Sequence, residues 1–188
     1  MATTQDNTGC TVAELNNILH PPSTGYFQLP TEDHNEVWPR LYIGNGSFAL
    51  DRPSLQSVGI THVLNVAQGE SLGKVNTDAQ FYKSVGIKFK GIKADDVSTF
   101  NLSRFWEETG KFIHKALNDN GKVLVHCYMG FSRAASTTIA YLMLYHNMSA
   151  QEATRTVKQK RNIGPNEGFL QQLCELDKKL MGKRKHKM

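Results

Sequence analysis

The chain has 188 residues, of which 39% are hydrophobic and 21% charged. This composition is typical of a soluble globular protein and excludes a disordered chain, and the length fits one domain with a sizeable core. No apolar stretch reaches the roughly 18 residues needed to cross a bilayer, so no membrane span is expected. The formal charge of +5 comes from residues 178–188, which hold six of the 22 Lys and Arg residues and none of the 17 acids.

The rest of the chain is therefore close to neutral, which argues against a nucleic-acid partner. The basic end is interpreted as solvated chain, with a nuclear-import signal or a tether to an anionic surface as alternatives. The first ten residues have neither a basic nor an apolar stretch, so no secretory signal is expected. We expect a flexible N-terminus over 1–10, one domain over 11–181 and a basic tail over 182–188.

The first half of the chain predicts one helix and then several short strands. Residues 11–20 carry apolar side chains at a helical spacing, with Thr11 as the N-cap, and two prolines follow. A polar loop is expected from there to about residue 35. Short strands are then predicted at 40–44, 61–66, 87–92 and 122–126, with helices near 47–58 and 103–118 between them. The strand at 122–126 lacks polar alternation, which is typical of a strand buried on both faces.

The last third of the chain predicts helices. Residues 134–146 are mostly apolar and indicate a buried helix, and Ser149 with Glu152 has the spacing of a capping box. Residues 165–180 form an amphipathic pattern with one apolar face: Phe169, Leu170, Leu173, Leu176 and Leu180. Strands alternating with helices, followed by a helical end, predict an α/β domain with helices packed on a sheet.

The chain has three cysteines, Cys10, Cys127 and Cys174, and their spacing is not that of a metal site. They are expected to be free thiols in a reducing compartment, the cytoplasm or the nucleus. An isolated cysteine is usually an inert core residue. Cys127, however, follows a buried strand and is separated by five residues from Arg133, where a helix begins.

A loop between a strand and a helix N-terminus offers free backbone N–H groups and a dipole that favours an anion. Gly130 allows such a loop to turn tightly, and Arg133 can pair two phosphate oxygens with its planar fork. The same field lowers the pKa of a thiol, so Cys127 is predicted to be a thiolate nucleophile. The predicted phosphate-binding loop comprises the residues after Cys127: Tyr128, Met129, Gly130, Phe131, Ser132 and Arg133.

The segment HCYMGFSR resembles the His-Cys-x5-Arg signature of the cysteine-based protein tyrosine phosphatases. The wider chain resembles the small (atypical) dual-specificity protein phosphatases, closest to the vaccinia-related VHR type. The resemblance runs from ELNNIL to QLCELDKKL, through NEVWPRLYIGN, VNTDAQFYK and NIGPNEGFL. It implies a central, mixed and mostly parallel sheet flanked by helices, hydrolysis of phosphotyrosine and phosphoserine/phosphothreonine through a phosphocysteine intermediate, no metal or other cofactor, and MAP kinases as candidate substrates.

Such a reaction needs an acid that protonates the leaving oxygen. Asp95 and Asp96 both follow a predicted strand, and spacing alone does not choose between them. The family pattern places the acid at Asp96, which would then act as the base toward water. His126 is expected under the loop as a hydrogen-bonded support. Arg161, in KQKRNIGPN, matches a family arginine near the substrate cleft, where a second phosphate or an acidic side chain would bind; the other interpretation is a surface charge.

The sequence departs from the family pattern directly after the signature arginine. A serine or threonine is usual there and stabilises the cysteine as a leaving thiolate, whereas this chain has Ala134 and Ala135, with a hydroxyl only at Ser136. Loss of such a hydrogen bond, about 1.5–3 kcal/mol, would slow turnover by about tenfold to a hundredfold. The alternatives are therefore a phosphate-binding pseudophosphatase, a sulfur transferase and an RNA 5′-triphosphatase.

The remaining loop residues bear on the substrate. Tyr128, Met129 and Phe131 are uncharged and bulky, whereas phosphoinositide-directed relatives carry basic residues at these positions. This favours a slot for phosphotyrosine, with Ser132 shaping the loop backbone. The physiological substrate and the oligomeric state do not follow from the sequence.

Overall fold

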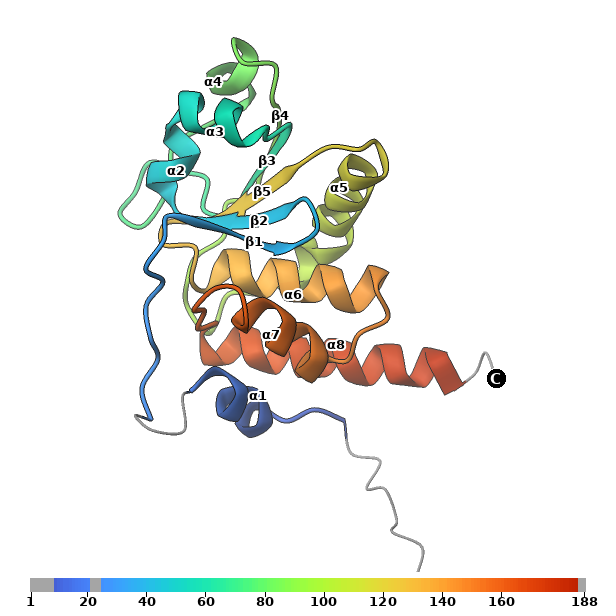
Figure 1. Ribbon diagram of the computed structural model, residues 1–188. Coiled ribbons are helices and arrows are strands. Elements are labelled where there is room, and N and C mark those ends of the chain that lie inside the picture. The colour runs from blue at the N-terminus through green and yellow to red at the C-terminus, as the bar shows by residue number, and fades with distance from the viewer. Residues whose placement is uncertain (1–8, 21–24, 186–188) are drawn as a thin grey trace, which may run out of the picture.

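The computed structural model describes residues 9–20 and 25–185 (Figure 1). Most of the predicted flexible N-terminus, and the last three residues of the predicted basic tail, lie outside the described residues. Within them, no helix is both long enough and apolar enough to span a membrane. All three cysteines are free thiols.

Five strands form one mixed sheet in the order β1-β2-β5-β3-β4. The edge strand β1 (His34–Trp38) is antiparallel to β2 (Leu41–Gly44), and the other pairs are parallel: β2 with β5 (Val123–His126), β5 with β3 (His62–Asn65), and β3 with β4 (Lys88–Gly91). The predicted mixed, mostly parallel sheet is confirmed. Loops that leave the carboxyl ends of the parallel strands therefore meet at one edge of the sheet, where α/β proteins bind their ligands.

Helices cover both faces of the sheet (Figure 1). A smaller apolar core lies between the sheet and the short helices α2 (Gly46–Leu50), α3 (Arg52–Val58) and α4 (Ala79–Lys83). The larger core joins the opposite face to α5 (Trp106–Asn118), which follows a 3-10 turn at Ser103–Phe105, and to α6 (Arg133–Tyr145).

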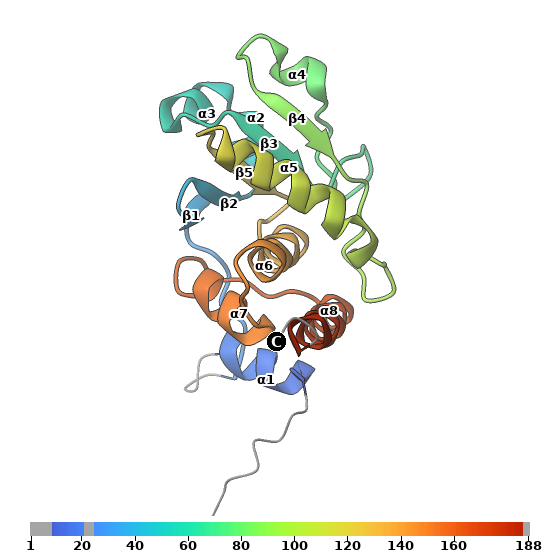
Figure 2. The same ribbon diagram turned by 90° about the vertical axis from the view of Figure 1, so that its right-hand side faces the viewer.

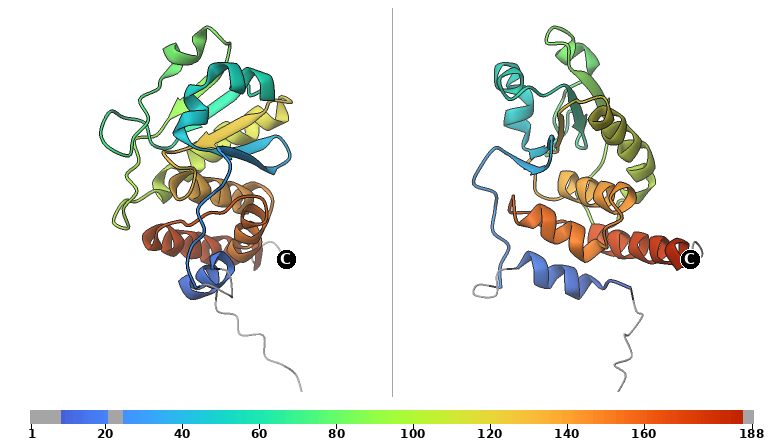
Figure 3. Two further views of the ribbon diagram at one scale, coloured as in Figure 1. Left: turned by 60° about the vertical axis from the view of Figure 1, so that its left-hand side comes forward. Right: turned by 45° about the vertical axis from the view of Figure 1, so that its right-hand side comes forward.

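Helix α6 is the centre of the larger core. It is buried from Arg133 to Met143, as its nearly continuous apolar sequence predicts. Figure 2 shows it end-on between the sheet and the helices α7 (Ala150–Lys158) and α8 (Glu167–Lys185). Helix α1 (Val12–Leu19) lies on the other side of α7 and α8, away from the sheet (Figure 3).

Several local predictions are confirmed and others are corrected. Capping boxes form at Thr11 with Glu14 and at Ser149 with Glu152, and α8 continues past the predicted end into the basic tail. The helix predicted near 47–58 is two helices, because the chain turns at Asp51, whose side chain accepts from Ser54 N and caps α3. Strand β1 and helix α4 were not predicted; each is only five residues long.

Candidate active site

The signature loop, residues 127–133, leaves β5 and enters α6 at the carboxyl edge of the sheet. Cys127 directly follows the strand and is 2% exposed. Gly130 has φ +64°, and a Cβ there would lie 2.5 Å from the carbonyl oxygen of Gly44 at the end of β2. Both the left-handed backbone and the close approach require glycine. The loop therefore has the tight, concave course that the sequence predicts.

Arg133 closes the loop from its far end and is 5% exposed. Its Nη1 donates to the carbonyl of Ala94 at 3.0 Å, and its Nη2 donates to the carbonyl of Gly73 at 2.8 Å. Its Nε is buried and has no hydrogen-bond partner within the described residues. A buried unpaired donor is costly, and more so when it is charged. An oxyanion held by the loop would satisfy this donor, so the residues present fit a phosphate group.

His126 lies beneath the loop, as expected, and is fully buried. Its Nδ1 is 3.1 Å from the carbonyl oxygen of Cys127, and because a carbonyl only accepts, we assign the proton to Nδ1. Burial lowers the pKa of His126 to about 4, although the bond to Cys127 opposes this shift. The imidazole is therefore neutral at physiological pH and supports the loop backbone.

This low pKa predicts a loss of stability in acid. A histidine whose pKa falls from 6.5 in the unfolded chain to about 4 in the folded one binds its proton more tightly when unfolded. The stability contributed by neutral His126 is fully present above pH 6.5 and is lost as the pH falls toward 4. We expect a loss of about 2 kcal/mol between about pH 7 and about pH 5. Urea unfolding at both pH values should show a larger loss for the wild type than for His126→Gln, and equal losses would contradict the assignment.

Of the two aspartates, only Asp96 has a printed contact with the signature loop. Its Oδ1 accepts from the hydroxyl of Ser132 at 2.8 Å and from Nδ2 of Asn166 at 2.9 Å. The backbone N–H of Asn166 also donates to the Ser132 hydroxyl at 3.0 Å, and the Asn166 side chain caps the first turn of α8. Ser132 thus does more than shape the backbone, because its hydroxyl joins the loop, Asp96 and the start of α8.

Asp95 is directed to a different partner. Its Oδ1 lies 2.6 Å from Nζ of Lys74, and the hydrogen bond from Lys74 holds the pKa of Asp95 below its usual range. A carboxyl with a lowered pKa is a poorer proton donor near neutral pH. The choice of Asp96 as the acid stays a prediction, and this geometry favours it.

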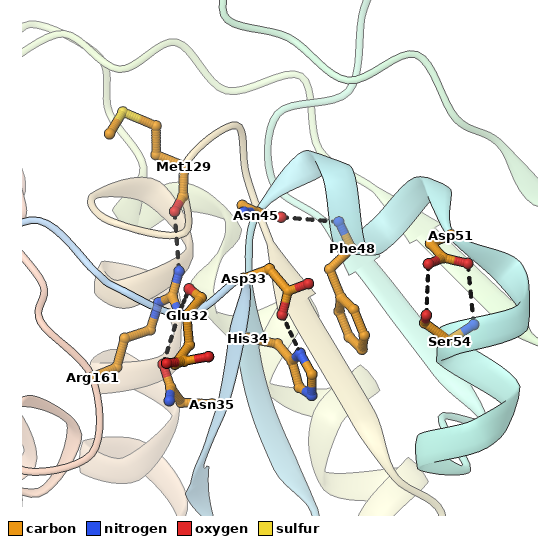
Figure 4. Close-up of polar contacts among 10 residues, drawn as sticks. All are labelled: Glu32, Asp33, His34, Asn35, Asn45, Phe48, Asp51, Ser54, Met129 and Arg161. Atoms are coloured by element: carbon orange, nitrogen blue, oxygen red, sulfur yellow. Dashed lines mark hydrogen bonds and ion pairs between the residues drawn. The ribbon is translucent and has the colours of Figure 1, made fainter.

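Arg161 is 3% exposed, so the interpretation as a surface charge is wrong. Its Nε donates to the carbonyl of Gly130 at 2.8 Å and its Nη2 to that of Met129 at 3.1 Å. Its Nη1 donates to the carbonyl of Glu32 and the side chain of Asn35, as Figure 4 shows. These bonds use four of the five N–H groups of a guanidinium. Arg161 therefore supports the loop from behind, and substrate binding by this residue stays a prediction.

Ala134, the residue that departs from the family pattern, is fully buried in the first turn of α6. The nearest hydroxyl in the sequence, that of Ser136, donates to the carbonyl of Ser132 at 2.7 Å. Its proton is therefore already engaged with the backbone of the helix. This bond argues against Ser136 as a substitute for the absent hydroxyl at position 134.

Comparison with known proteins identifies the family. Residues 41–179 match the family model described as the dual specificity phosphatase catalytic domain. The chain belongs to this family. Its resemblance to the small dual-specificity phosphatases is thereby confirmed, while its closeness to the vaccinia-related type stays a prediction.

Solved structures agree with this assignment. The human tyrosine phosphatase-like serine/threonine/tyrosine-interacting protein is 32% identical, with a TM-score of 0.71 over 79% of this chain and 97% of that chain. A mouse putative dual specificity phosphatase, complexed with zinc tungstate, is 28% identical, with a TM-score of 0.70 over 86% and 97%. Human DUSP28 is 26% identical, with a TM-score of 0.70 over 82% and 99%.

Several residues of this phosphatase domain's site were missed at the level of sequence. Asn166 lies in the NIGPNEGFL segment that carries part of the family resemblance, and its amide and cap position could have indicated a role. Gly73 and Ala94 contribute only backbone carbonyls, which no side-chain pattern reveals. Lys74 gave no signal beyond an isolated charge in a polar loop.

Proposed function

We propose that this chain is a dual-specificity protein phosphatase that hydrolyses phosphotyrosine and phosphoserine/phosphothreonine through a phosphocysteine intermediate. Cys127 is the nucleophile, Arg133 and the loop N–H groups bind the phosphoryl oxygens, and Asp96 is the general acid. The observation that carries the proposal is the buried, unpartnered Nε of Arg133 in the loop that begins at Cys127. The family supplies the coarser class, a protein phosphatase.

The chemistry proceeds in two steps. The Cys127 thiolate attacks phosphorus, so that a P–S bond forms and the P–O bond to the leaving group breaks, while protonated Asp96 gives its proton to that oxygen. Asp96, now a carboxylate, takes a proton from water, which attacks phosphorus and releases the thiolate and inorganic phosphate. The hydrogen bonds from Ser132 and Asn166 hold the carboxyl beside the loop, which supports both of its roles.

Hydrolysis of an aryl phosphate, with and without vanadate, tests the proposal. Vanadate is an oxyanion that the loop is expected to hold in place of phosphate. We expect turnover by the wild type that vanadate inhibits. A rate no higher than that of Cys127→Ser would overturn the proposed activity.

A pseudophosphatase is the second candidate, and Ala134 is the observation that favours it. One similar structure is that of a protein named as tyrosine phosphatase-like and as an interacting protein. On this alternative the loop would bind a phosphoprotein without turning it over. Phosphopeptide binding that is sensitive to vanadate, together with absent hydrolysis, would identify this case.

MAP-kinase-like phosphoproteins are proposed as substrates, and the cytoplasm or nucleus as the compartment. The first proposal rests on the family resemblance alone, and the second on the three free thiols. Capture of phosphoproteins by Asp96→Ala, compared with Cys127→Ser, would identify substrates that the loop retains.

Ala134 predicts a burst of product. Without a hydroxyl that stabilises the leaving thiolate, hydrolysis of phosphocysteine should be slower than its formation, by about tenfold to a hundredfold relative to a serine-containing enzyme. Rapid mixing with an activated aryl phosphate should release about one equivalent of phenol before slow turnover. Ala134→Ser should raise the steady-state rate and reduce the burst. No burst in the wild type and no gain in Ala134→Ser would contradict this account.

A further inference from the structure

An open groove of about 510 Å³ lies beside the signature loop. Its walls come from the segment before β1, from α2, from the loop after β3 and from the signature loop itself. Four of its lining side chains are large, apolar and between 43% and 58% exposed: Leu29, Leu50, Tyr128 and Met129. Exposed apolar side chains that gather in one concave place indicate a binding surface. We call this place the apolar groove.

The cationic side chains that line the apolar groove are already engaged. Arg161 donates to the loop carbonyls, and Figure 4 shows the Met129 side chain directed away from it. Lys74 is 10% exposed and donates to the carbonyl of Ala94 at 2.6 Å, and it pairs with Asp95 at 2.6 Å. An acidic ligand would therefore find little attraction in the apolar groove, whereas an apolar side chain would bury surface against several walls.

We propose that the apolar groove binds a large apolar side chain within about three residues of the phosphorylated residue of a protein substrate. This inference rests on the proposed function. Tyr128 and Met129 immediately follow Cys127 in the chain, so the groove begins within about 7 Å of the Cys127 backbone. An extended peptide advances about 3.5 Å per residue, so residues next to the phosphorylated one reach this distance. The occupant is a leucine-, methionine- or phenylalanine-like side chain.

Three phosphotyrosine peptides test the inference; they are identical except for leucine, alanine or aspartate at the flanking positions. We expect kcat/KM to be about tenfold higher for leucine than for alanine, the range in which apolar pockets discriminate. Aspartate should give no gain over alanine. Leu50→Gln should reduce the preference for leucine to about twofold or less without changing hydrolysis of an aryl phosphate, which is too small to reach Leu50. The matched control is Leu72→Gln, because Leu72 is fully exposed and does not line the groove.

The outcomes separate this inference from the proposed function. Equal kcat/KM for the leucine and alanine peptides, with normal aryl phosphate hydrolysis, would overturn the groove assignment alone. Faster hydrolysis of a phosphoinositide in vesicles than of the leucine peptide would also overturn it, in favour of a lipid. If aryl phosphate is not hydrolysed, the proposed function fails, and peptide dissociation constants measured by fluorescence anisotropy decide the groove: tighter binding of the leucine peptide supports it, and equal binding overturns it.

Discussion

Replacing Cys127 by serine is expected to lower phosphatase activity to less than about one-thousandth of the wild type, because a serine hydroxyl is hardly ionised at neutral pH. The fold should be retained, since the new oxygen replaces a buried sulfur in a loop that Arg161 and His126 hold by its carbonyls. Aryl phosphate hydrolysis measures the first effect. Thermal unfolding and vanadate binding measure the second.

Cys174→Ser is the matched control. Cys174 is also a buried free thiol, but it belongs to α8 and not to the signature loop. It should retain activity. Residual activity of Cys127→Ser above about one-thousandth of the wild type would exclude Cys127 as the nucleophile.

The second large effect is expected at Asp96. Asp96→Asn should lose about 10²–10⁴-fold in kcat on substrates with poor leaving groups, because the amide has no proton to give the departing oxygen. Activated aryl phosphates need less protonation and should lose less. The amide oxygen can still accept from Ser132, so the loop should keep its position. Steady-state kinetics on a series of aryl phosphates with different leaving groups measure the difference.

Asp95→Asn is the neighbouring control and should change activity little. Asp95 is exposed and its pairing with Lys74 is a surface interaction, which contributes little to stability. If both variants lost activity equally, the family pattern would have placed the acid in the wrong register. If Asp95→Asn alone lost activity, the two roles would be exchanged.

The sequence predicts those parts of the site that are local in the chain. The strand, the turn at Gly130 and the helix that begins at Arg133 follow from contiguous residues, and the structure has all three. The partners of Arg133 do not follow, because Ala94 and Gly73 lie 39 and 60 positions away and offer only backbone carbonyls. Long-range backbone contacts leave no pattern in side chains.

Arg161 was misjudged for a similar reason. Its neighbours in KQKRNIGPN are mostly polar, which favours an exposed position. Its burial depends on Glu32 and Asn35, more than a hundred residues earlier, which cover it from the segment before β1. That segment was predicted as a loop, and the strand that it enters was not predicted because only Val37 of its five residues is buried.

The bonds from Arg133 to Ala94 and Gly73 have an entropic consequence. An arginine side chain carries about 2 kcal/mol of rotamer entropy, which a flexible side chain loses when it closes on a ligand. Here two nitrogens of the guanidinium are fixed by backbone carbonyls, so most of that entropy is lost during folding. Binding of an oxyanion then requires no search through rotamers at this residue. Preorganisation of this kind increases affinity without adding any contact.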